Sequence, residues 1–190
     1  MFQILAIISG VLAGLSHLPY LVDIIKKTTK PERASWFIWS VLATIAFSSQ
    51  FAEGARWSLF FVAMDSFGVI LTFLLSIKYG MGGLQRRDII ALIAAGIGLL
   101  LWYFTRHAEI ALYITILIDL TGTVLTVIKS YEDPGSETFI TWIGISIAAI
   151  LGTISVGKLN FVLLIYPLYI FLANFAVVIA ILLGRRQSAH

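Results

Sequence analysis

Long apolar stretches separated by short polar segments run along the whole chain. Continuous apolar runs such as Ile89–Leu101 lack the strict alternation of barrel strands, so they predict helices. A helix needs roughly 20 mostly apolar residues to cross a bilayer, where it satisfies its own backbone groups. We therefore predict an all-α integral membrane protein with seven transmembrane helices, at about 3–25, 36–53, 57–79, 88–105, 109–129, 136–156 and 160–184.

The composition supports a membrane protein. Hydrophobic residues make up 59% of the 190 residues and charged residues 12%, with a mean hydropathy of +0.97, whereas soluble domains are about 25% charged. The first span lacks a basic segment before it and is too long for a signal peptide, so we expect it to be retained. The absence of cysteine excludes disulfides and thiolate metal sites. We expect no cofactor, and we expect the protein in the bacterial inner (plasma) membrane with the lipid bilayer as a partner.

Basic residues are distributed unequally between the two ends of the predicted helices. The end that would carry the C-terminus holds ten of them: Lys26, Lys27, Lys30, Arg33, Lys78, Arg86, Arg87, Lys129, Arg185 and Arg186. The other end holds three: Arg56, Arg106 and Lys158. Because cytoplasmic loops carry the excess of Lys and Arg, we expect the N-terminus outside and the C-terminus in the cytoplasm. The net charge of +3 therefore does not indicate a nucleic-acid partner.

Three landmark residues recur after the fourth predicted span. They share one offset of 103 residues (134 − 31, 142 − 39 and 157 − 54): Pro31 and Pro134, Trp39 and Trp142, Gly54 and Gly157. The offset covers four spans, so two triplets of helices would have the same orientation, as in transporters with parallel repeats. We expect a 3+1+3 layout, with a first triple-helix repeat at 1–80, a linker helix within 81–108 and a second repeat at 109–190. Chance matching of apolar segments is the alternative.

Residues 18–35 resemble the PQ-loop signature, which has a Pro-Gln pair late in a first helix, a basic cytoplasmic loop and a Ser at the next helix. Here Pro19 precedes Tyr20 in place of Gln, and Ser35 follows the basic loop. The chain thus resembles the SWEET and PQ-loop (MtN3-like) superfamily of transporters. That resemblance implies a seven-helix 3+1+3 fold with the N-terminus outside.

Two carboxylates lie deep in the predicted spans. Asp65 follows Trp57 by roughly 12 Å of helix, and Asp119 follows Ile110 by nearly the same distance from the same side. An ionisable group at the bilayer centre costs about 2.5–3.5 kcal/mol, so each is a candidate for substrate or ion binding. If both face one cavity, their repulsion favours a bound proton or cation. The alternative is that each is a structural group bonded to nearby Ser, Thr or Tyr side chains.

Prolines remove helix hydrogen bonds in the first and seventh spans. Pro19 makes Ser16–Tyr20 a candidate hinge, where His17 could titrate near neutral pH or bond a backbone carbonyl as a neutral ring. Pro167 makes a second kink. We expect His17, Pro19, Tyr20 and Pro167 to take part in gating.

Asn174 and two tryptophans are the other candidates for solute binding. SWEET-type pockets use Asn and Trp from both triplets, so the resemblance implies such a role for Asn174. Its counterpart at the repeat offset is Leu71, which predicts an asymmetric pocket. Trp39 and Trp142, on the cytoplasmic side, either line the inner mouth or belong to the interfacial aromatic belt.

These features predict a small-solute transporter working by alternating access, and not an enzyme. The resemblance implies a sugar-like neutral polar substrate, and the aspartates make proton coupling an option. The alternatives are a PnuC-like vitamin or nucleoside carrier and a non-transporting PQ-loop-type receptor. An intramembrane aspartyl protease is disfavoured, because its Tyr-Asp and Gly-x-Gly-Asp signatures are missing around Asp65 and Asp119. One chain could form a complete pore, and a homo-oligomer is also compatible with the sequence.

Overall fold

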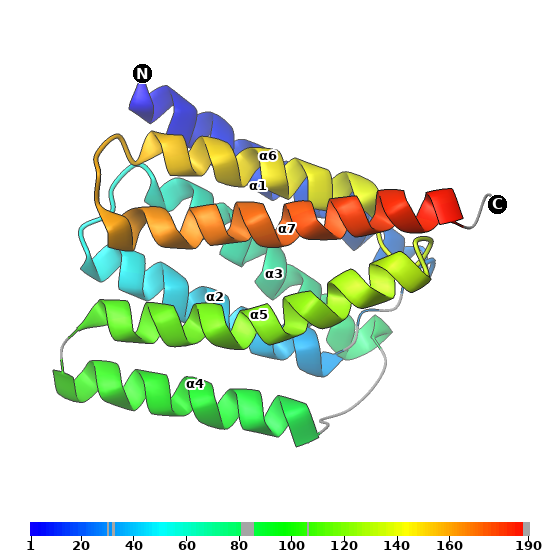
Figure 1. The fold of residues 1–190 in the computed structure, drawn as a ribbon, viewed down its shortest axis with the longest axis horizontal. Coiled ribbons are helices and arrows are strands. Elements are labelled where there is room, and N and C mark those ends of the chain that lie inside the picture. Colours follow the sequence, from blue (N-terminus) through cyan, green and yellow to red (C-terminus); the bar gives the residue numbers. More distant parts are fainter. Residues whose placement is uncertain (30, 32, 81–85, 106, 188–190) are drawn as a thin grey trace.

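The chain folds into α-helices joined by short loops (Figure 1). This computed structural model describes residues 1–29, 31, 33–80, 86–105 and 107–187. The helices within this part are α1 (Phe2–Ile25), α2 (Arg33–Ala52), α3 (Leu59–Tyr79), α4 (Arg86–Thr105), α5 (Ala108–Glu132), α6 (Phe139–Ser155) and α7 (Phe161–Gln187). Their ends lie within three residues of the predicted ones. Residues 81–85 and 106 of the expected linker segment at 81–108 lie outside the described residues.

Among the described residues, five helices are long and apolar enough to cross a membrane, and a sixth helix is apolar but shorter. Helices α1, α2, α3, α5 and α7 contain segments long and apolar enough to cross a bilayer, and α6 is a shorter apolar helix. Helix α4 is not among them in the part of the chain that the structure describes. It opens on a charged residue, Arg86, and lies at the edge of the bundle (Figure 1). The expectation of seven spans is therefore corrected to six.

Polar and apolar side chains are distributed as a lipid environment requires. Large apolar side chains are exposed along the outside of the bundle, among them Leu15, Ile77, Leu117 and Leu172. The interior instead buries many small hydroxyl side chains, such as Ser9, Thr72 and Thr115. Membrane helices use small polar residues at their contacts, and a monomeric soluble protein rarely exposes such large apolar areas. The fold is therefore that of a membrane-embedded helical protein.

Six helices form a closed ring. Helix α3 lies between α1 and α2, and helix α7 lies between α5 and α6. The two groups meet at two seams, one of α1 against α6 and the other of α2 against α5. Helix α4 packs outside this ring, against α5 and α2 (Figure 1). The centre of the ring is therefore reached by side chains from six helices.

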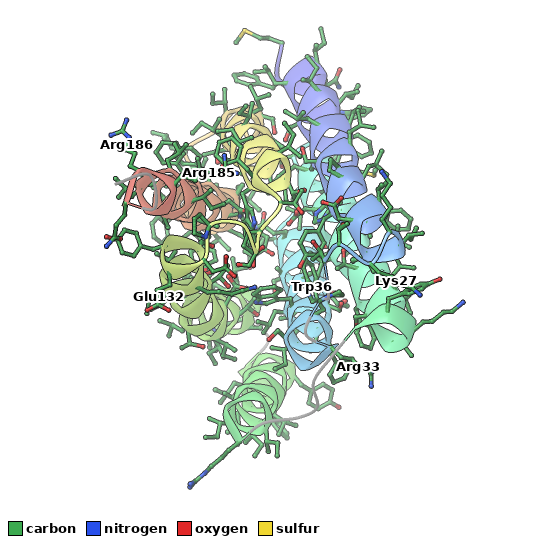
Figure 2. All side chains as sticks on the ribbon, turned by 90° about the vertical axis from the view of Figure 1, so that its right-hand side faces the viewer. Lys27, Arg33, Trp36, Glu132, Arg185 and Arg186 are labelled. Carbon is green, nitrogen blue, oxygen red and sulfur yellow. The ribbon has the colours of Figure 1, made fainter. Side chains whose placement is uncertain are left out.

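The two ends of the bundle differ in charge. The termini lie at opposite ends (Figure 1). Lys27, Arg33, Arg185 and Arg186 all lie at the end that carries the C-terminus (Figure 2). Of the thirteen basic residues counted from the sequence, Lys30 and Arg106 lie outside the described residues. Which side of the membrane the basic end faces stays a prediction.

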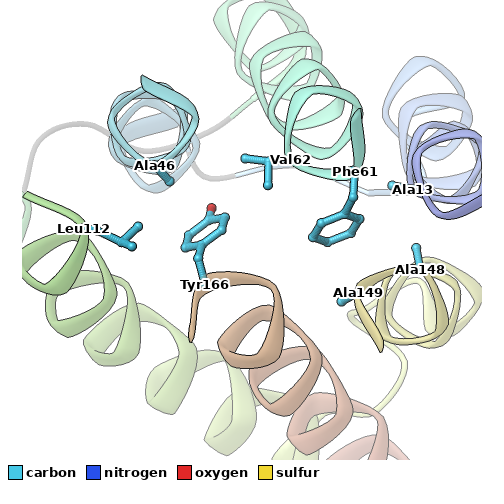
Figure 3. Packing of buried hydrophobic residues seen from close by; sticks show 8 residues of the cluster. All are labelled: Ala13, Ala46, Phe61, Val62, Leu112, Ala148, Ala149 and Tyr166. Atoms are coloured by element: carbon cyan, nitrogen blue, oxygen red, sulfur yellow. The ribbon is translucent and has the colours of Figure 1, made fainter. Parts of the chain in front are cut away.

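An apolar cluster closes the ring in the half nearer the N-terminus. Phe61 of α3 points toward Ala148 and Ala149 of α6, while Tyr166 of α7 lies between Leu112 and Phe61 (Figure 3). All of these residues are buried. Polar contacts reinforce this half, since the Gln50 Nε2 of α2 donates to the Val162 carbonyl of α7 at 2.9 Å.

Glycines bring α1 and α6 into close contact. A Cβ atom built on Gly144 would lie 2.2 Å from the Ser16 Oγ, and one on Gly152 would lie 2.8 Å from the Phe61 ring. One turn from Gly152, Ser9 Oγ donates to the Ala148 carbonyl at 2.6 Å. Small residues thus let the two backbones approach, as is common for membrane helices.

Replacing Gly144 by Ala should destabilise the fold, because the added methyl group collides with Ser16. We expect the free energy of unfolding to fall by about 1–3 kcal/mol, measured by denaturant titration in detergent with circular dichroism. Gly96→Ala in α4 is the matched control, because nothing lies within 4 Å of its Cβ position. That variant should be as stable as the wild type or more stable by about 0.5–1 kcal/mol. Equal effects of the two substitutions would contradict the packing of α1 on α6.

Candidate solute-binding cavity

A cavity with about 90 Å³ of space open to water lies inside the ring of helices. All six ring helices contribute to its wall, and its polar lining residues are His17, Trp39, Asp65, Thr115, Asp119, Thr123, Thr126, Trp142, Tyr166 and Asn174. It lies near the middle of the bundle, where α5 lines it from Thr115 to Thr126, and its wall includes Trp39 and Trp142 near the starts of α2 and α6 at the basic end. The apolar cluster covers its other end, and Tyr166 belongs to both.

The structure brings all five predicted solute-binding residues to this cavity. They come from five different helices: Trp39 from α2, Asp65 from α3, Asp119 from α5, Trp142 from α6 and Asn174 from α7. Of the predicted gating residues, only His17 lines the cavity. Whether these residues bind a solute stays a prediction, but their convergence from distant parts of the chain gives that prediction a single location.

Asp65 is paired with His17. The His17 Nε2 lies 3.0 Å from the Asp65 Oδ1, and both side chains are almost fully buried. Gly68, one turn after Asp65, makes room for the ring, because a Cβ atom there would lie 2.1 Å from His17 Cδ2. The other ring nitrogen, His17 Nδ1, is buried without a hydrogen-bond partner among the described residues. A buried carboxylate needs a donor, and here an imidazole from α1 supplies it.

Asp119 has hydroxyl partners instead. The Tyr169 hydroxyl donates to Asp119 Oδ2, and Thr123 Oγ1, one turn away on α5, donates to the same oxygen at 3.2 Å. Thr123 and Tyr169 are also 3.3 Å apart through their oxygens. The expected alternative of a carboxylate bonded to Thr and Tyr side chains is therefore what the geometry around Asp119 shows. Both of these hydrogen bonds end on Oδ2 of the carboxylate, and not on Oδ1.

Both tryptophans face inward rather than the lipid interface. Trp39 packs edge-on against Trp36, with ring centroids 5.1 Å apart. A Cβ atom on Gly122 of α5 would lie 3.2 Å from Trp39 Nε1, so the lack of a side chain at Gly122 lets the Trp39 ring of α2 approach α5 closely. The Trp142 Nε1 donates to the Glu137 Oε2 at 3.1 Å. Of the two roles left open by the sequence, lining the inner cavity is the one that the geometry fits.

The remaining candidates occupy supporting positions. The Asn174 Nδ2 donates to the Ile170 carbonyl of its own helix at 2.8 Å, while the residue lines the cavity. Helices α1 and α7 run through Pro19 and Pro167 without a break. Tyr20 is buried and packs on Trp36, with ring centroids 5.2 Å apart. These three gating candidates therefore lie near the cavity wall or within its supporting helices, and their role in gating stays a prediction.

Charge at the cavity is acidic or neutral. Two carboxyl groups, of Asp65 and Asp119, and the imidazole of His17 line it, and no Lys or Arg lines it among the described residues. No group of three or more His, Cys, Asp or Glu residues in the described ranges could hold a metal ion. The wall therefore suits a neutral or cationic solute better than an anion.

The sequence did not reveal the partners of the two carboxylates. His17 and Asp65 are 48 residues apart, and Tyr169 and Asp119 are 50 apart. The signal that could have found them is physical: a buried carboxylate requires donors, and His17 and Tyr169 are strong donors inside neighbouring spans.

No family model, curated protein or solved structure matches the chain. The cavity and its residues are therefore the basis for assigning a function.

The bond between Tyr169 and Asp119 can be measured by a double-mutant cycle. We expect Tyr169→Phe to lower the free energy of unfolding by about 1–3 kcal/mol, because it removes one of the two hydroxyl donors to the partly buried Asp119 carboxylate. Combined with Asp119→Asn, the two effects should fail to add by about 0.5–3 kcal/mol. Tyr113→Phe, on the same helix as Asp119 but outside the cavity, should change stability by about 0.5 kcal/mol or less. Additive effects of the two cavity substitutions would show that the residues are not coupled.

Proposed function

We propose that this protein is a small-solute transporter that works by alternating access, with the cavity as its solute site. The observation that carries the proposal is the meeting of polar side chains from all six ring helices at one cavity. Ionisable and polar groups within a membrane protein usually mark a substrate or ion pathway. Two carboxylates, an imidazole and an amide around a space that water can occupy are costly to bury, and a bundle that binds no solute or ion would not need them there.

Two parallel repeats are part of this proposal. Exchanging α1, α2 and α3 for α5, α6 and α7 converts each principal contact within the ring into another observed one. For example, α1 against α6 becomes α5 against α2. The landmark glycines support the same correspondence, since Gly54 and Gly157 follow α2 and α6 and both have a positive φ, of 79° and 67°. Such parallel repeats are one of the two common transporter designs.

The position of the cavity supports a carrier rather than an open channel. One end is covered by the apolar cluster around Phe61 and Tyr166, and Trp39 and Trp142 line the side nearer the basic end. With that end in the cytoplasm, as the positive-inside rule favours, the conformation is closed to the outside. Alternating access then requires the two triplets to rock, which would open the cluster and close the inner side around Trp39 and Trp142.

A neutral polar solute such as a sugar is the first substrate class. It is implied by the resemblance to SWEET and PQ-loop proteins, and it suits a wall with indole rings, hydroxyls and the Asn174 amide. Hydroxyl groups of a sugar could donate to the Asp119 carboxylate, and its apolar face could stack on an indole. A PnuC-like carrier of a flat vitamin or nucleoside is the second candidate, because Trp39 and Trp142 both line the cavity.

Transport itself is tested with purified protein in liposomes. Glucose, sucrose, a set of amino acids and uridine are offered as labelled solutes, with and without a pH gradient. We expect at least one to enter faster than into empty vesicles. Saturable binding of a solute that does not cross would instead identify a receptor, and no faster entry of any solute would refute the carrier.

Trp142→Ala should weaken the solute site. Loss of an aromatic contact worth about 0.5–1.5 kcal/mol should raise the half-saturating concentration of the transported solute by about 2- to 10-fold. The control is Trp57→Ala, because Trp57 is exposed and lies outside the cavity. The comparison is made by initial rates over a concentration series. An equal change in both variants would place the solute elsewhere.

A further inference from the structure

We propose that His17 and Asp65 form a proton-binding site, and that His17 Nδ1 takes up and releases one proton in each transport cycle. This inference rests on the proposed carrier function. It assigns the coupling ion to one of the two carboxylates at the cavity and excludes the other.

The first reason is the unused nitrogen of His17. A carboxylate can only accept, so the ring donates to Asp65 through Nε2, and with a single ring proton Nδ1 carries a lone pair. Nδ1 is buried without a partner among the described residues, on a side chain that is 3% exposed. The pair therefore has a vacant position for one more proton. That proton would come from water in the cavity.

The second reason is that neither protonation state satisfies all of the buried groups. Without the extra proton, the pair carries one net negative charge in a poorly hydrated interior, which is unfavourable. With it, imidazolium and carboxylate form a neutral ion pair, but the Nδ1–H lacks an acceptor. These opposing penalties make the balance sensitive to small changes around Nδ1. A conformational change that brings water or a carbonyl to Nδ1 favours the protonated form.

The third reason is the contrast with Asp119. Each carboxylate joins the first helix of a triplet to the third: Asp65 of α3 pairs with His17 of α1, and Asp119 of α5 pairs with Tyr169 of α7. The positions correspond, but the chemistry differs. Tyr169 and Thr123 are hydroxyl donors and offer no base that could accept a proton at neutral pH. Only the first triplet therefore has a titratable base beside its carboxylate.

The surroundings of His17 allow its charge to influence the cavity. The titratable groups that face it there are Asp65 from α3, Asp119 from α5 and Tyr166 from α7, whereas α2 and α6 contribute the uncharged Trp39 and Trp142. Protonation thus adds the sole positive charge to a cavity wall that otherwise carries carboxylates. Pro19, two residues after His17, removes one helix hydrogen bond and lets α1 bend next to the pair. Proton binding and helix movement can therefore affect each other directly.

The proton site can be tested on the purified protein alone, by NMR of histidine labelled with nitrogen-15. His17→Gln identifies the His17 signals, and the exposed His107 serves as an internal reference. We expect wild-type His17 to change from a neutral ring protonated at Nε2 to an imidazolium between about pH 8 and pH 5. In Asp65→Asn, the ratio of protonated to neutral ring at a given pH should fall by about tenfold or more, because the counter-ion is lost. Asp119→Asn should change this ratio much less. A His17 ring that stays in one form over this range, or an equal effect of both substitutions, would overturn the assignment.

Coupling is tested in liposomes with the solutes of the transport screen. For each variant, the measured quantity is the ratio of uptake with a pH gradient to uptake without one, so that differences in basal rate cancel. The wild type and Asp119→Asn should have ratios well above one, while His17→Gln and Asp65→Asn should have ratios close to one. If solutes cross but the wild-type ratio is one, the coupling inference fails and the carrier stands. If no solute crosses, the carrier fails, and the NMR titration still decides whether the pair binds a proton.

Discussion

Desolvation of the interior carboxylates is the constraint on which the inner arrangement depends. Water is scarce between the helices of a membrane bundle, so a carboxylate there must find donors on neighbouring helices. Asp65 finds an imidazole and Asp119 finds two hydroxyls. Each hydrogen bond ties the first helix of a triplet to its third, α1 to α3 and α5 to α7, at the depth of the cavity. The hydrogen bonds that compensate for the desolvation of the two carboxylates therefore also fix the positions of the helices that form the cavity wall.

Close packing and open space occupy different halves of the bundle. Near the N-terminal end, an apolar cluster and the Gln50 contact fill the ring. Nearer the basic end, threonines, indoles and carboxylates surround a space that is left unfilled. Apolar contacts depend little on direction, so they can form again after the triplets move relative to each other. Hydrogen bonds depend on direction and are lost when their partners move. The apolar cluster can thus separate once the Gln50 bond breaks, and a polar wall is suited to recognise a solute.

The sequence predicted the helices well, because an apolar run long enough to span a bilayer has few other ways to satisfy its backbone. It also selected the residues that meet at the cavity, because a charged or amide side chain inside such a run is conspicuous. It could not pair them. The rotation of each helix and the choice of its neighbour depend on packing, such as the room that Gly68 leaves for the His17 ring. The orientation of Trp39 could not be predicted for the same reason, since a tryptophan one turn from a helix end suits either an interface or a cavity. The sequence predicted seven membrane spans, whereas six of the described helices are candidates. Helix α4 contains an apolar run, but it begins at the charged Arg86 and lies at the edge of the bundle (Figure 1).

The two seams of the ring are not equivalent toward the surrounding lipid. Helix α4 packs on both α2 and α5, so it covers the seam between them on the outside of the ring. The seam between α1 and α6 has no such cover among the described helices, and there the backbones are held close by glycines and by the bond from Ser9 to the Ala148 carbonyl. Acyl chains can press directly on this second seam but reach the first only past α4. Lateral pressure and bilayer thickness would therefore act on the two sides of the ring unequally, giving the lipid composition a directional influence on how the two halves tilt.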